Sequence, residues 1–114
     1  MDRDYMLEYL LSLDDSFIDM EDDWEVHVRA HQIPSTRQRP HGLRYSLTLH
    51  NTLGERVLGY DNAHFARDGK RQGTFDHIHR GSRVRHYQYV DAEALLADFL
   101  KDVDQHIEEH RSKK

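Results

Sequence analysis

At residues 43–50 the chain reads LRYSLTLH, an uninterrupted alternation of apolar and polar side chains. Successive side chains of a β-strand point to opposite faces, so this alternation predicts a strand with one face in a core and the other in water. The next residues, Asn51 to Gly54, are turn formers, and an apolar-rich run returns at 56–60. The two runs therefore predict an antiparallel hairpin.

Three further segments are predicted to complete the sheet. Residues 24–30 repeat the alternation, and residues 17–20 are expected to pair with them through an acidic turn. Residues 83–90 predict another strand, with two tyrosines on one face, and residues 1–13 fit either a short helix or an extended arm. The core face of the strand at 24–30 is expected to carry Trp24, Val26, Val28 and Ala30.

The C-terminal segment predicts a long amphipathic helix. Asp91 is a favourable N-cap, and Glu93 complements the positive end of the helix dipole. The apolar stripe needs a partner, which we expect to be one face of the sheet. We therefore predict an α+β fold in one domain, residues 1–114, with an antiparallel meander of four to five strands. The stripe consists of Leu95, Leu96, Phe99, Leu100, Val103 and Ile107.

Composition narrows the class of protein. The 114 residues include no cysteine, which excludes disulfides and thiolate chemistry and fits a cytoplasmic location. No apolar run is long enough to span a bilayer, so no membrane association is expected. Residues 1–25 carry ten acidic side chains and one basic one, whereas residues 26–90 carry eleven basic and four acidic. A basic middle suits polyanions, unless folding interleaves these charges into a neutral surface.

Histidine is the second anomaly, with ten copies, eight of them between His27 and His86. Imidazole changes charge near neutral pH, so this enrichment suggests proton transfer or metal ligation. One candidate cluster, Asp61, Asn62 and His64, follows the predicted strand at 56–60. The alternative is that Asp61 and Asn62 simply bind nearby backbone, as turn residues do.

A second cluster lies at Asp76-His77-Ile78-His79-Arg80, inside a polar stretch, 62–82, that we interpret as a functional or disordered loop. If the cluster is extended, its two imidazoles point the same way and Ile78 packs inward. They would then suit general acid–base chemistry on a phosphodiester, or zinc binding with help from a carboxylate.

Basic side chains surround this pair of histidines. With two nearby tyrosines as stacking surfaces, they suggest single-stranded nucleic acid as a ligand, although tyrosines at alternate positions also suit a core. No phosphate-binding glycine loop or dinucleotide fingerprint occurs, so no cofactor is expected. The predicted substrate-binding residues are Arg67, Lys70, Arg71, Arg83, Arg85 and Asn62.

Taken in order, several stretches resemble the TumE family, with a match from about Tyr5 to Ile107. Leu100 departs from the family, which often has tryptophan there. The resemblance implies the toxin of a type II toxin–antitoxin pair, with a helix-turn-helix antitoxin as partner. The stretches that carry it are Trp24-Glu25-Val26, residues 40–50, Gly59-Tyr60-Asp61-Asn62-Ala63-His64, Asp76-His77-Ile78-His79, Tyr87-Gln88-Tyr89 and residues 95–99.

Together these observations predict a cytoplasmic toxin that cleaves RNA without metal or cofactor, and they leave a homodimer open. One alternative is a binding module for RNA or protein without catalysis. The other is a metal-dependent nuclease with Asp61, His64, His77 and His79 around one ion. The predicted catalytic residues are His64, His77, His79, Asp61, Asp76 and Arg80.

Overall fold

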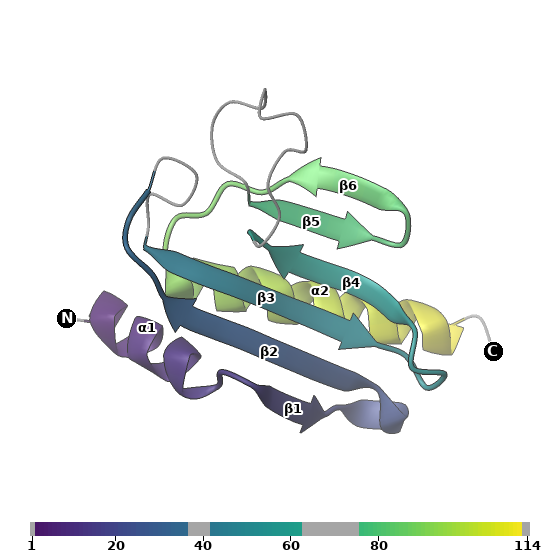
Figure 1. Ribbon diagram of the computed structural model, residues 1–114. Helices are drawn as coiled ribbons and strands as arrows, with labels where there is room; N and C mark the ends of the chain where they lie inside the picture. Colours follow the sequence, from purple (N-terminus) through teal and green to yellow (C-terminus); the bar gives the residue numbers. More distant parts are fainter. Residues whose placement is uncertain (1, 37–41, 63–75, 113–114) are drawn as a thin grey trace.

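The computed structural model describes residues 2–36, 42–62 and 76–112. Its fold is α+β, with one antiparallel sheet whose six strands follow one another in chain order (Figure 1). The elements are α1 (Asp2–Ser12), β1 (Ser16–Asp19), a 3-10 turn η1 (Glu21–Asp23), β2 (Glu25–Gln32), β3 (Leu43–His50), β4 (Arg56–Asp61), β5 (His77–Arg80), β6 (Arg83–His86) and α2 (Ala92–Ser112).

The alternation read from the sequence sets the register of the two central strands. Val28 lies opposite Leu47 and Ala30 lies opposite Tyr45, and all four side chains are buried. Each fully buried side chain of the size of leucine contributes about 1.5–3 kcal/mol relative to an exposed one. The intervening polar side chains of β2 and β3 therefore point to the opposite face of the sheet.

Helix α2 covers the apolar face (Figure 1). As predicted, Asp91 is its N-cap, because its Oδ1 accepts the N–H of Ala94 at 2.8 Å. Leu95, Phe99 and Val103 are buried, but Leu100, which we placed in the stripe, is 46% exposed. Of the two alternatives for the N-terminus the helix is present: α1 contacts α2 and β2 on this same side.

The sheet has six strands, where four to five were predicted. The difference arises at β5, which lies within the stretch that we interpreted as a loop, and which pairs with both β4 and β6. A tight turn at Gly81, with φ of +60°, joins β5 to β6. Strand β6 is also shorter than predicted, so Tyr87 and Tyr89 lie beyond its end. The four residues of β5 lie in a long polar stretch, where so short an alternation is hard to distinguish from a loop.

Candidate active site on the open face of the sheet

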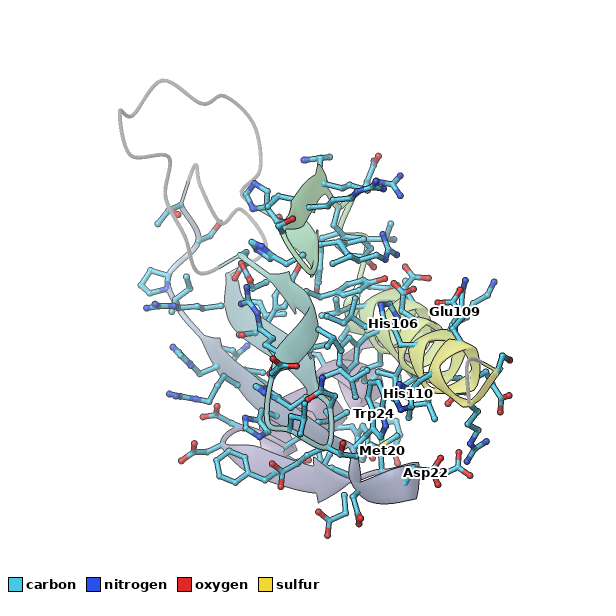
Figure 2. The ribbon with its side chains drawn as sticks, turned by 90° about the vertical axis from the view of Figure 1, so that its right-hand side faces the viewer. Met20, Asp22, Trp24, His106, Glu109 and His110 are labelled. Atoms are coloured by element: carbon cyan, nitrogen blue, oxygen red, sulfur yellow. The ribbon has the colours of Figure 1, made fainter. Side chains whose placement is uncertain are left out.

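One face of the sheet packs against α2, and no helix of the described ranges covers the other, which we call the open face (Figure 2). Strand alternation places most of the described histidines on the open face. The two exceptions, His106 and His110, belong to α2, where His110 meets Trp24 edge to face at 5.5 Å (Figure 2). The open-face histidines are His27, His31, His50, His77, His79 and His86.

The most deeply buried contact of an imidazole with a carboxylate on this face joins Asp61 and His79. Asp61 ends β4, and His79 lies on β5 opposite Gly59, so its ring reaches the carboxylate along the diagonal of the ladder. His79 Nε2 lies 3.1 Å from Asp61 Oδ2, and the two side chains are 15% and 3% exposed. The contact has the distance of an ion pair but not the geometry of a hydrogen bond, and within the part of the chain that the structure describes the other oxygen, Oδ1, accepts no hydrogen bond either.

This arrangement can orient a proton-transfer group. A carboxylate so deeply buried is costly unless a positive or hydrogen-donating partner faces it, and the imidazole is that partner. A carboxylate at Nε2 favours the tautomer with its proton on that nitrogen, which makes Nδ1 the basic nitrogen of the ring. A small rotation of the ring that turned this contact into a hydrogen bond would thus leave His79 in a form suited to accept a proton.

A second imidazole lies beside the pair. His77 is directly opposite Asp61 in the ladder, is 8% exposed, and has its ring centroid 6.2 Å from that of His79. On its other side it faces the exposed His86 of β6. The prediction that His77 and His79 point the same way while Ile78 packs inward is confirmed. Two imidazoles thus flank one buried carboxylate.

The structure does not bring Asp76 and Arg80 to this group. Both side chains point to the helix side. There Asp76 Oδ2 accepts a hydrogen bond from the hydroxyl of buried Tyr45, with the two oxygens 2.7 Å apart. Arg80 Nη2 lies 2.6 Å from Asp102 Oδ2 on α2. Their sequence neighbours His77 and His79 are on the opposite face, because alternate side chains of one strand diverge.

Asn62 has a buried position directly after Asp61. Its Oδ1 accepts the N–H of Tyr45 at 2.9 Å, and its Nδ2 donates to the carbonyl of Leu43 at 2.7 Å. These bonds fasten the end of β4 to β3 and so help to position Asp61. Two of the predicted substrate-binding residues, Arg83 and Arg85, are exposed on β6, opposite Arg80 and Ile78 and hence on the helix side.

Four predicted residues lie outside the described residues. They are His64 among the proposed catalytic groups and Arg67, Lys70 and Arg71 among the basic ones. Across the described ranges, no three histidine, aspartate or glutamate side chains converge as metal ligands would. The described residues alone therefore do not form the four-ligand metal centre considered from the sequence.

A cavity on the open face reaches Ser46, the strand partner of Asp61, and is lined by residues that were not among the predicted site residues. Its volume is about 330 Å³. Its charged side chains stand on the polar half of the alternation in β2 and β3, which is the signal that could have revealed them. Only the apolar half of that pattern entered the prediction. The lining residues are Arg29, His31, Arg44, Tyr45 and Ser46.

Three aromatic rings stack at the other end of the open face. His27 lies between Phe17 and His50, with ring centroids 4.4 Å and 3.9 Å away, respectively. Its Nε2 is 2.8 Å from Glu25 Oε1. Burial, and then the neighbouring His27, lower the pKa of His50 below its ordinary value of 6.5. The face therefore offers ring surface as well as imidazole and guanidinium groups.

The family model described as Toxin TumE matches residues 7–107. The chain belongs to the TumE family. The resemblance seen in the motifs is thereby confirmed, and TumE membership implies a toxin role and an antitoxin as partner. No curated protein and no solved structure matches the chain.

The TumE match spans all six strands, so it contains the Asp61–His79 pair, its neighbour His77 and the cavity beside them. Neither described helix is long and apolar enough to cross a membrane.

Proposed function

We propose that this TumE-family protein is a ribonuclease toxin that cleaves RNA by acid–base chemistry without a metal ion. The observation that carries the proposal is the contact of His79 with buried Asp61, beside a second imidazole. The proposed site of action is the cytoplasm, where the toxin would be held inactive by an antitoxin with a helix-turn-helix domain. The proposal holds for a monomer as well as for a homodimer, and sedimentation distinguishes the two.

The reaction needs one group to accept a proton and another to donate one. His79 takes the proton of a ribose 2′-hydroxyl, and the 2′-oxygen attacks the adjacent phosphorus. The bond from phosphorus to the 5′-oxygen breaks as His77, in its protonated form, donates a proton to that oxygen. The products are a 2′,3′-cyclic phosphate and a 5′-hydroxyl end.

Asp61 acts through His79. Its carboxylate holds the imidazole in the required tautomer and stabilises the imidazolium that forms when the ring accepts the proton. The two proton-transfer residues stand on the same face and on the same strand. A single phosphodiester lying over β5 would therefore contact both.

The purified protein tests the proposal. We expect it to cleave single-stranded RNA to 2′,3′-cyclic phosphate ends after dialysis against EDTA, and His79→Ala to lower the rate by about 10²–10⁴-fold. His110→Ala on α2 is the matched control and should retain the parent rate. Equal rates for parent and His79→Ala would refute the assignment, and loss of activity on EDTA dialysis would favour the metal-dependent alternative. Salt-sensitive RNA binding without products would favour the non-catalytic one.

A further inference from the structure

From the cavity beside Asp61 we infer a second element of the same site: a subsite for a phosphate group of single-stranded RNA, next to the bond that is cleaved. The inference rests on the proposed function, because it gives the substrate of that reaction a path across the sheet. Its main groups are the guanidinium groups of Arg29 and Arg44, with His31 as a third donor.

Register connects this cavity to the proposed catalytic group. Arg29, Ser46 and Asp61 lie side by side on β2, β3 and β4. Neighbouring strands are about 4.8 Å apart, so the row from Arg29 to Asp61 spans roughly 10 Å. Arg44 precedes Ser46 by two residues on the same face, opposite His31. A strand of RNA running across β2 to β5 would meet the cavity and the imidazoles in succession.

The charges of the cavity suit an anion. Arg44 is exposed and makes no ion pair with any residue of the described ranges. Arg29 is 59% exposed and has Asp14 and Asp15 at 3.5 Å and 3.9 Å, contacts that water screens strongly. Within those ranges no acidic side chain lines the cavity. Two planar guanidinium groups in one depression match the oxygens of a phosphate.

The aromatic stack favours RNA over an acidic peptide as the ligand. His27 precedes Arg29 by two residues on the same face, and its ring continues into Phe17, which is 66% exposed. Bases of single-stranded nucleic acid stack favourably on such rings, whatever their sequence. A carboxylate-rich peptide would use the arginines but leave this ring surface without a partner.

The experiment measures binding of a fluorescent 12-nucleotide single-stranded RNA to the His79→Ala protein, in which cleavage is suppressed. Added to that background, Arg29→Gln and Arg44→Gln should each weaken binding about 3–10-fold. Each should also reduce the slope of log K against log salt by about 0.7, since one phosphate contact is lost. Lys101→Gln, which removes one exposed charge from α2, is the control and should change neither quantity. Arg44→Lys should restore most of the slope.

The outcomes separate the two proposals. If the parent cleaves RNA but Arg29→Gln and Arg44→Gln keep the affinity and slope of their background, the subsite is wrong and the ribonuclease stands. If the parent neither binds nor cleaves RNA, both proposals fall. Loss of binding to a polyglutamate peptide in the arginine variants, with RNA binding unchanged, would also overturn the subsite. Thermal unfolding of each variant confirms that the fold is intact.

Discussion

The two faces of the sheet use the same kinds of residue differently. On the helix side, each of three carboxylates accepts a hydrogen bond from a tyrosine hydroxyl. On the open face, Asp61 instead faces an imidazole, 3.1 Å away. The partner decides what a buried carboxylate can do, since tyrosine holds its proton near neutral pH and histidine exchanges it. The helix-side pairs are Tyr45 with Asp76, Tyr60 with Asp102 and Tyr87 with Asp98.

The packing on the helix side makes these tyrosines still weaker acids. Burial, together with the adjoining carboxylates, raises the pKa of Tyr45, Tyr60 and Tyr87 well above the ordinary value of 10. Burial likewise raises the pKa of Tyr89 to about 12. The helix side therefore supplies fixed hydrogen bonds, and the open face supplies imidazole groups.

The largest effect expected from this difference concerns activity. A variant with both His77→Ala and His79→Ala should lose RNA cleavage by about 10³-fold or more, because both proton-transfer groups are gone. The matched variant, His106→Ala with His110→Ala, removes two histidines from α2 and should keep the parent rate. Cleavage of a labelled RNA under single-turnover conditions measures both. Similar losses of cleavage rate in the two variants would contradict the proposal that only the open face takes part in catalysis.

A smaller effect is expected in stability on the helix side. Asp102→Ala removes the oxygen, Oδ2, that accepts hydrogen bonds from both the Tyr60 hydroxyl and Arg80 Nη2. The two donor–acceptor distances are 2.5 Å and 2.6 Å, respectively. We expect the free energy of unfolding to fall by about 2 kcal/mol, a value discounted because Arg80 is 33% exposed. Urea denaturation measures it, with the exposed Asp104→Ala as control. Cleavage per folded molecule should stay at the parent level, and a fall in cleavage without destabilisation would place this pair in the chemistry.

The smallest effect is a pH dependence on the open face. The folded protein lowers the pKa of His50, so the unfolded chain binds a proton more readily. The corresponding stability is present above pH 6.5 and is lost as the pH falls from there through the folded-state pKa. Between pH 7.5 and 5.5 the parent should therefore lose more thermal stability than His50→Gln does. An equal loss in both proteins would show that His50 has no part in the dependence.

The elements with a long, regular period were predicted from the sequence. Strands β2 and β3 alternate over eight residues each, and α2 repeats an apolar stripe over several turns. Strand β5 has only four residues within a polar stretch, so its alternation is too brief to separate from that of a loop, whereas β6 was predicted over residues 83–90 and covers only Arg83–His86. Pairing with β4 on one side and β6 on the other decides the conformation of β5.

The candidate site was predictable only in part, because closeness in sequence is a poor guide to closeness across a sheet. Asp76 and His77 are neighbours in the chain yet lie on opposite faces. Asp61 and His79 are eighteen positions apart in the chain, yet their side chains are in contact between the adjacent strands β4 and β5. Alternation places Arg29 and Arg44 on the open face, but no local motif encodes the register that brings them beside Asp61.

The most direct test compares one carboxylate from each face. The single-turnover rate of RNA cleavage would be measured for Asp61→Asn and Asp76→Asn, each corrected for the folded fraction. The account predicts a loss of roughly 10²-fold or more for Asp61→Asn, because the imidazole loses its orienting charge, and a rate within about fivefold of the parent for Asp76→Asn. Equal rates for the two variants, or a greater loss for Asp76→Asn, would contradict it.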